Sequence, residues 1–139
     1  MILTKKQLQK IKELALRHKL VLIILFGSQS RNETHSESDI DIAYIPQNAI
    51  SIEDEVNINY RLTLILGSND VDTLNMHRAS PLLLKQIFEK PVVLYQKTGQ
   101  EFPRYEMYSM RSYSDAMPLF EMHRNELNEF LNDKKTYGT

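Results

Sequence analysis

Apolar positions along the chain recur with two different periods, and these periods separate helices from strands. Residues 4–19 carry apolar side chains at helical spacing, which predicts an amphipathic helix. Thr4 and Gln7 match a capping box at its start. The following run LVLIILF, Leu20–Phe26, is unbroken, apolar and rich in branched residues, as in a strand covered on both faces. The chain therefore begins with a surface helix and a buried strand.

The middle of the chain continues to alternate between strand and helix signals. Residues 38–45 alternate with a period of two, so that Asp39 and Asp41 would point to one face of a strand. A helix is expected between Ser51, which can cap its start, and Gly67, which can cap its end. The remaining elements are a strand over 71–76, a helix from 80 to about 89 and a strand over 91–96. This order predicts an α/β sandwich with a small mixed sheet flanked by helices.

The last part of the chain, residues 101–133, is again helical in pattern, and Pro118 must kink or split this helix. Tyr, Met and Phe form its apolar stripe. The stripe can pack against the sheet or bind a partner, since Tyr and Met are enriched in interface cores, and the two sides of the helix can do both. We therefore divide the chain into a domain over 1–97 and a partner-binding helical extension over 98–139. The stripe consists of Tyr105, Met107, Tyr108, Met110, Tyr113, Met117, Phe120 and Met122.

Composition excludes several classes of function. The 139 residues include no cysteine, which rules out disulfides, zinc–thiolate sites and cysteine nucleophiles and fits a cytoplasmic protein. Charged residues interrupt positions 1–19, so this segment is neither a signal peptide nor a membrane span. A net charge of −1 argues against broad capture of nucleic acid, and direct nucleic-acid binding is not expected. A few local groups can still hold one nucleotide with its metal.

One spacing carries candidate chemistry: Gly27-Ser28, ten residues, and then Asp39-Ile40-Asp41. Two aspartates on one face of a strand repel each other and are disfavoured on folding grounds alone. They become favourable if that face meets a divalent cation, because Mg²⁺ prefers hard oxygen ligands and also bridges phosphates. Gly27 allows backbone amides to approach a phosphate closely, and the hydroxyl of Ser28 adds a donor. The alternative is a surface strand with two solvated acids.

A third acid is expected on the neighbouring strand. Asp72 is the candidate, either to take a proton from an attacking hydroxyl or to complete a second metal site. Asp70 competes for this place, but its position in a turn suggests a solvated side chain. Arg31 follows Ser28 closely and could neutralise a triphosphate, or it could be an ordinary solvated loop arginine.

These residues carry a resemblance to a known family. The stretches FGSQSR (26–31) and SDIDI (38–42), with VDTLN (71–75) and RASP (78–81), resemble the minimal nucleotidyltransferase (MNT) branch of the DNA polymerase β superfamily. The resemblance covers roughly residues 1–97 and implies a polymerase-β-like nucleotidyltransferase fold. It implies that Asp39, Asp41 and Asp72 are catalytic and bind Mg²⁺. It also implies that ATP is bound by Gly27, Ser28, Arg31 and Ser38.

Two positions depart from the family pattern. Asn32 stands where the family usually has glycine, and asparagine tolerates left-handed backbone well. Asn75 stands where an acid is common, which puts a metal role there in doubt.

MNT proteins of this size with a helical tail resemble the MntA-type antitoxins of HEPN–MNT toxin–antitoxin pairs. The resemblance implies transfer of AMP from ATP to a tyrosine of a HEPN ribonuclease toxin, which silences the toxin. Residues 101–139 are too few for a separate acceptor-binding domain, which agrees with a protein acceptor. Two alternatives remain open: a non-catalytic antitoxin that occludes its partner, and a small-molecule nucleotidyltransferase of the antibiotic-resistance type. A neighbouring gene for an all-helical protein with an Arg-x4–6-His motif would favour the toxin–antitoxin reading.

Overall fold

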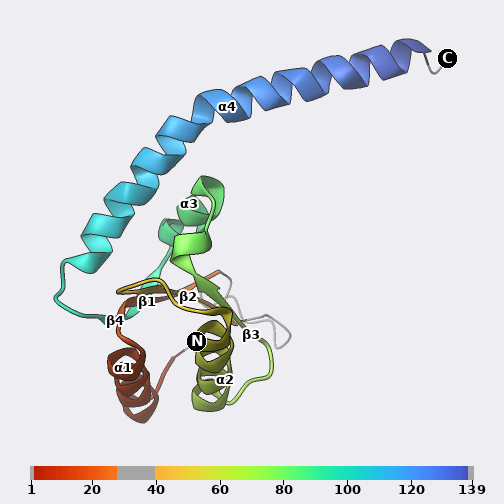
Figure 1. Ribbon diagram of the computed structural model, residues 1–139. Coiled ribbons are helices and arrows are strands. Elements are labelled where there is room, and N and C mark those ends of the chain that lie inside the picture. Colours follow the sequence, from red (N-terminus) through yellow and green to blue (C-terminus); the bar gives the residue numbers. More distant parts are fainter. Residues whose placement is uncertain (1, 28–39, 138–139) are drawn as a thin grey trace.

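A computed structural model describes residues 2–27 and 40–137 of the chain (Figure 1). The helices and strands follow the expected order α-β-β-α-β-α-β-α, with one short 3-10 helix added after the third strand. The elements are α1 (Lys5–His18), β1 (Leu20–Phe26), β2 (Ile40–Pro46), α2 (Ile52–Leu66), β3 (Val71–Asn75), η2 (Met76–Arg78), α3 (Pro81–Glu89), β4 (Val92–Gln96) and α4 (Glu101–Tyr137).

The four strands form one mixed sheet in the order β3-β2-β1-β4. β1 pairs antiparallel with both β2 and β4, while β2 pairs parallel with β3. The predicted small mixed sheet is therefore confirmed. β3 lies at one edge of this sheet, and its N-terminal end pairs with the start of β2, which in turn pairs with the end of β1.

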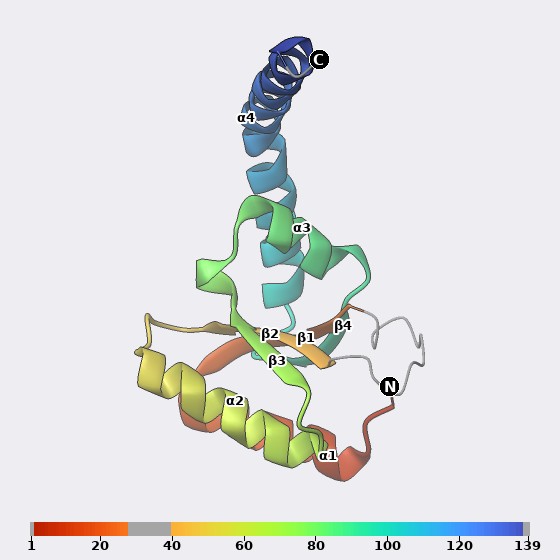
Figure 2. The same cartoon turned by 90° about the vertical axis from the view of Figure 1, so that its right-hand side faces the viewer.

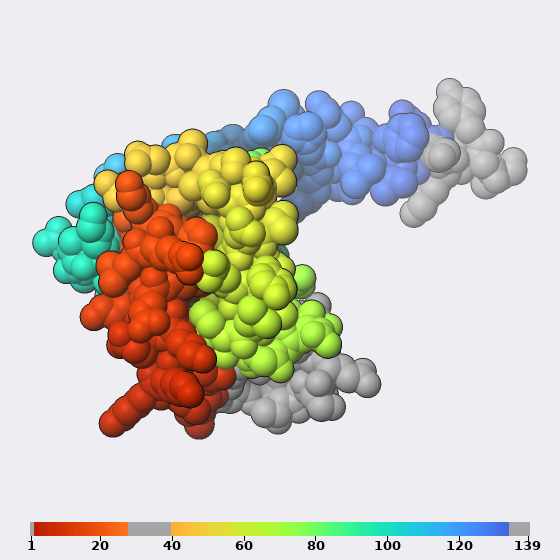
Figure 3. All heavy atoms as spheres, turned by 60° about the horizontal axis from the view of Figure 1, so that its bottom comes forward, coloured from red at the N-terminus to blue at the C-terminus, as the bar shows by residue number. Residues whose placement is uncertain are grey.

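Helices cover both faces of the sheet, which explains the unbroken apolar run of β1. α1 and α2 lie side by side on one face, and α3 with the start of α4 lies on the other (Figures 1, 2 and 3). Leu20, Ile23 and Leu25 of β1 belong to the apolar cluster under α1 and α2. Leu22 and Ile24 belong to the cluster under α3. A strand with a core on each side needs apolar residues at every position.

The helix ends follow the predicted capping chemistry. The Thr4 hydroxyl accepts a hydrogen bond from the Gln7 backbone, and the Gln7 side chain accepts one from the Thr4 backbone, which completes the capping box. The hydroxyls of Ser51 and Ser80 cap α2 and α3, accepting hydrogen bonds from the backbone amides of Asp54 and Leu83. Gly67 ends α2 in the left-handed conformation with φ of 66°. The boundaries of α1, α2 and α3 thus come from local sequence.

α4 is a single helix of 37 residues that continues through Pro118. It bends along its length and projects well beyond α3 (Figure 1), so Pro118 does not split it into two helices. Its first turns pack on the domain, where Phe102 contacts Phe88 with ring centroids 5.6 Å apart. Residues 121–133 are all exposed. No helix in the described part of the chain has the length and apolar character of a membrane span.

Some residues of the apolar stripe of α4 pack against the domain, and others are exposed and available to a partner. Tyr105 packs against the cluster under α3, and Tyr113, Met117 and Phe120 are half-buried. The others are exposed, and further large apolar residues are exposed beyond them. The exposed residues of α4 are Met107, Tyr108, Met110, Leu119, Met122, Leu127, Phe130 and Leu131.

Candidate active site

Strand register brings two of the predicted acids together. Asp41 lies opposite Asp72 in the parallel pair of β2 and β3, and opposite Phe26 in the antiparallel pair of β1 and β2. Neighbouring strands lie about 4.8 Å apart. The two aspartates and the end of β1 therefore meet at one end of the sheet.

Strand alternation sets the face on which the two acids lie. Ile40 and Ile42 of β2 enter the cluster under α1 and α2, so Asp41 between them points to the α3 face. Val71 of β3 also enters that cluster, which places Asp72 on the same face as Asp41. Asp41 is half-buried and Asp72 is exposed. The carboxylates thus form an open patch at the end of the sheet.

Gly27 follows β1 directly and lies against Asp41. Its φ of 79° is in the left-handed region that glycine adopts freely. A Cβ atom built at this position would lie only 2.5 Å from Oδ2 of Asp41, much closer than side chains approach each other. Two independent features therefore require glycine here, the backbone conformation and the space beside the carboxylate.

A set of polar contacts between α2 and β3 was not apparent from the sequence. The Asn59 amide on α2 donates hydrogen bonds to the Val71 carbonyl and to the Thr73 hydroxyl, both at 3.1 Å. These two residues stand on either side of Asp72. No spacing or motif distinguishes Asn59 from other polar residues of an amphipathic helix, and only the three-dimensional arrangement reveals it.

A second set of contacts holds the other end of β3. Glu55 accepts hydrogen bonds from the Asn75 side chain at 3.0 Å and from Nε of Arg78 at 2.7 Å. The Asn75 side chain also accepts one from the His77 backbone. Burial and, less strongly, the charge of Glu55 raise the pKa of the nearby Tyr44 phenol. Asn75 therefore has a structural role, at the far end of β3 from Asp72.

Of the other candidate residues, four lie outside the described part of the chain and one, Asp70, lies outside the carboxylate site. Ser28, Arg31, Ser38 and Asp39 lie outside the described residues. Asp70 stands in the turn before β3 and is exposed, as expected from the sequence. Within residues 2–27 and 40–137, no group of three or more His, Cys, Asp and Glu side chains could hold a metal ion. The described part of the site thus consists of Gly27, Asp41 and Asp72.

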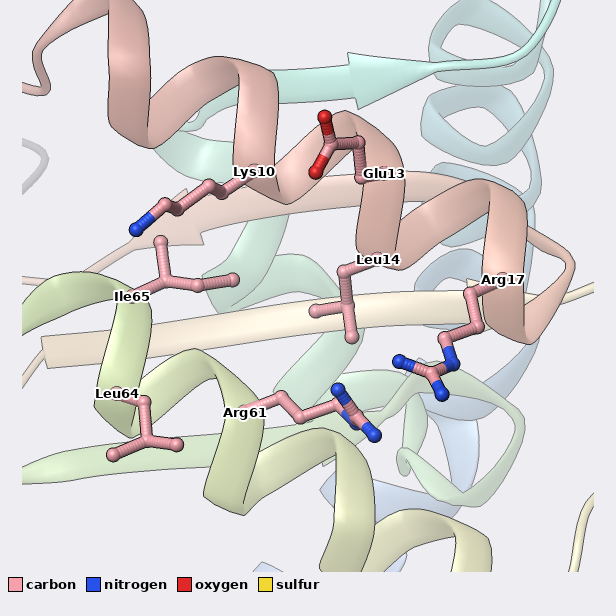
Figure 4. Close-up of a pocket in the computed structure, with 7 residues that line it drawn as sticks. All are labelled: Lys10, Glu13, Leu14, Arg17, Arg61, Leu64 and Ile65. Carbon is pink, nitrogen blue, oxygen red and sulfur yellow. The ribbon is translucent and has the colours of Figure 1, made fainter.

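A separate groove of about 270 Å³ runs between α1 and α2, on the face of the sheet opposite to the acids. Figure 4 shows Arg17 of α1 and Arg61 of α2 turned toward each other, with Leu14 between the helices. Burial lowers the pKa of the adjacent His18, and the charges of Arg61 and Arg17 lower it further. This groove is not part of the carboxylate site.

Residues 9–100 match the model of the family "Polymerase beta, Nucleotidyltransferase". The match covers all four strands and includes Gly27, Asp41 and Asp72. The chain belongs to this nucleotidyltransferase family. The matched range ends at residue 100, so α4 lies outside it.

Two relatives of this nucleotidyltransferase carry names of protein-modifying enzymes. A Methanocaldococcus jannaschii protein, provisionally named a protein adenylyltransferase, is 36% identical over 84 residues, which are 60% of this chain and 89% of that protein. The protein adenylyltransferase MntA of Shewanella oneidensis is 38% identical over 69 residues, which are 50% of this chain and 49% of that protein. The second match therefore spans about half of each protein.

Solved structures extend the similarity into α4. A chain of a toxin–antitoxin complex crystallised with AMP-PNP is 26% identical, with a TM-score of 0.70, and the match covers 89% of this chain and 98% of that chain. A chain from a complex of the tri-AMPylated HEPN toxin and MNT antitoxin of Shewanella oneidensis is 25% identical, also with a TM-score of 0.70, over 87% and 95% of the two chains. The predicted nucleotidyltransferase fold is thus confirmed.

Proposed function

We propose that the chain is an antitoxin that transfers AMP from ATP to a tyrosine hydroxyl of a HEPN-type toxin. The observation that carries this proposal is the register of Asp41 with Asp72 beside Gly27. Two like charges directly opposite each other destabilise a sheet, so their presence together points to a cation that they share. The relatives supply the reaction, since one was crystallised with an ATP analogue and another with an AMPylated toxin.

The donor set fits Mg²⁺, which the family implies. Asp41 and Asp72 provide hard carboxylate oxygens on adjacent strands, and the missing side chain of Gly27 allows the Asp41 carboxylate to lie directly against the end of β1. In this proposal Asp41 and Asp72 hold the ion together with Asp39. A bound Mg²⁺ would neutralise charge on the phosphates and on the leaving group.

The chain's own residues then position the two reactants. Gly27 lets the phosphates of ATP approach the end of β1, and Ser28, Arg31 and Ser38 complete the contacts with ATP. Asp72 is exposed on an edge strand, where an incoming tyrosine can reach it. The tyrosine oxygen forms a bond to the α-phosphorus, the bond to the β-phosphate oxygen breaks, and pyrophosphate leaves. The carboxylate of Asp72 accepts the proton of the hydroxyl. We place this reaction in the cytoplasm, in keeping with a chain without cysteine.

The toxin also needs a binding surface, and in this proposal α4 provides it within the extension over 98–139. Leu127 and Leu131 lie one helical turn apart on the projecting half of α4 and are 56% and 46% exposed. A helix with large exposed apolar side chains is typical of a partner-binding element. The double variant Leu127→Ser/Leu131→Ser should weaken toxin binding about 10-fold or more, because each leucine contributes roughly 1.5–3 kcal/mol when buried. Asn128→Ser, a polar change on the same turn, should leave toxin binding unchanged in calorimetry.

Mass spectrometry of the toxin tests the proposed reaction. After incubation with the chain, ATP and Mg²⁺, the toxin should gain mass in steps of one AMP and lose its ribonuclease activity. An Asp41→Ala/Asp72→Ala variant separates catalysis from occlusion. If this variant still silences the toxin without any mass gain, the chain acts by binding alone.

A further inference from the structure

Asn59 on α2 donates hydrogen bonds to the two residues of β3 that flank Asp72. Its side-chain amide donates to the Val71 carbonyl oxygen and to Oγ1 of Thr73, each at 3.1 Å. Asp72 lies between these two residues. The three positions alternate along the strand, so Asn59 contacts β3 from the α2 face while Asp72 points to the α3 face. Asn59 therefore holds the backbone of Asp72 without entering the carboxylate site.

The Val71 carbonyl lies at the edge of the sheet, where the hydrogen bond from Asn59 satisfies it. Among the strands of residues 2–27 and 40–137, β3 lies at the edge of the sheet and pairs with β2 alone. The preceding carbonyl, that of Asp70, accepts a hydrogen bond from the Ile40 amide of β2 at 2.8 Å. Successive carbonyls of a strand point to opposite sides, so the Val71 carbonyl points to the free edge of the sheet. Asn59 provides there the hydrogen bond that a further strand would otherwise make.

Asn59 is itself held in place by its helix. Its side-chain contacts with β3 are partly buried. α2 packs on the sheet through the fully buried Ile58 and Leu62. The position of the Asn59 amide is thus fixed by a packed element, which a positioning residue requires.

We propose that Asn59 is a positioning residue that sets the place of the Asp72 carboxylate relative to Asp41. This inference rests on the proposed function, in which both acids hold Mg²⁺. Without the Asn59 amide, the start of β3 keeps, among the contacts of the described residues, its pairing with β2 and the packing of Val71. The separation of the two carboxylates then varies, and the affinity for Mg²⁺ falls. Supporting residues of this kind typically change metal affinity or activity by about 10- to 100-fold.

The same helix offers a matched comparison. Glu55, one turn before Asn59, holds the other end of β3 through Asn75. Removal of the Glu55 side chain should weaken the attachment of β3 at Asn75, three residues after Asp72. Removal of the Asn59 side chain weakens the attachment at the residues directly beside Asp72. Thr63 provides a second comparison, because its hydroxyl contacts α2 and not β3.

The test measures Mg²⁺ dependence in the full chain by two methods. The first is AMP transfer to the toxin as a function of Mg²⁺ concentration. The second is the rise in Tm that Mg²⁺ produces in the presence of AMP-PNP and the absence of the toxin, which reports binding without AMP transfer. For Asn59→Ala, we expect the half-saturating Mg²⁺ concentration to rise about 10- to 100-fold in both measurements. Thr73→Val, which removes one of the two contacts, should have a smaller effect in the same direction. Thr73→Ser, which keeps the hydroxyl, should match the wild type.

Each outcome either supports or overturns the role of Asn59. Unchanged half-saturation in Glu55→Ala and Thr63→Val, with a rise in Asn59→Ala, supports it. A lower maximal rate in Asn59→Ala at unchanged Mg²⁺ half-saturation would show a general structural role and overturn it. An equal rise in Glu55→Ala would also overturn it. If Asn59→Ala does not fold, the Thr73→Val and Thr73→Ser pair decides. A wild-type chain that transfers no AMP would refute the proposed function, while the Tm measurement would still decide the role of Asn59.

Discussion

Replacement of Gly27 by alanine perturbs the site through a single methyl group. The new Cβ would lie 2.5 Å from Oδ2 of Asp41, so the carboxylate must retreat by about 1 Å to reach an ordinary contact distance. A misplacement of about 1 Å can reduce an enzymatic rate about 100-fold. The backbone at φ of 79° also becomes strained, at a cost of about 1–2 kcal/mol for a residue with a Cβ. Gly27→Ala should therefore lose most AMP transfer and a modest part of its stability.

Gly67→Ala separates these two effects. Gly67 has a similar φ of 66°, but a Cβ at this position meets nothing within 4 Å. The variant should lose about 1–2 kcal/mol of stability from the same strain and keep its activity. Urea unfolding and the rate of AMP transfer, measured on both variants, provide the comparison. Transfer by Gly27→Ala within a few-fold of the wild-type rate would refute the geometric reasoning, as would an equal loss of activity in Gly67→Ala.

Three further changes test other parts of the molecule. Asp72→Asn should abolish AMP transfer. Its free energy of unfolding in urea without metal should be unchanged or up to about 1 kcal/mol higher, because the substitution removes a like charge opposite Asp41. A clearly lower free energy of unfolding would contradict the proposed repulsion. Glu101 is buried, which by itself would raise its pKa, but hydrogen bonds from the side chain and backbone of Thr98 lower the pKa below 4.5. The ionised Glu101 thus stabilises the fold above about pH 4.5, and this contribution is lost as the pH falls through the lowered pKa. Glu101→Gln should therefore lower the Tm at pH 7 and differ less from the wild type in acid. Pro118→Ala should restore a helical hydrogen bond and slow amide hydrogen exchange in the far half of α4, because a proline inside a helix destabilises it by about 3 kcal/mol. Unchanged exchange would show that the bend of α4 has another cause.

Much of the fold could be predicted because local chemistry determines it. The unbroken run of β1 predicts a strand with helices on both faces, and the clusters on its two sides confirm this. Thr4, Ser51, Gly67 and Ser80 set the helix ends through contacts within a few residues, so sequence alone locates them. The sequence predicted Asp72 on a strand next to that of Asp41, but the register that places the two residues opposite each other comes from the structure.

Features that depend on distant contacts could not be predicted. The role of Asn59 requires α2 and the free edge of β3 to meet, and no local signal gives that arrangement. Pro118 predicted either a kink or a split, and the sequence could not decide between them; α4 continues as one bent helix, because only one hydrogen bond is lost and the helix can bend on its exposed part. The 3-10 helix η2 was not predicted, because the expected strand ran on through Met76; the contacts of Glu55 with Asn75 and Arg78, which are distant in sequence, were not predicted either.

The transfer of label from ATP to the toxin distinguishes AMP transfer from other reactions of ATP. The full chain, Mg²⁺ and the toxin are incubated with ATP labelled at either the α- or the γ-phosphorus. We predict that the α-label appears on a toxin tyrosine, that the γ-label is released as pyrophosphate, and that Asp41→Asn and Asp72→Asn variants transfer neither. Labelling of the toxin from γ-labelled ATP, or α-label transfer that survives loss of both carboxylates, would contradict the account.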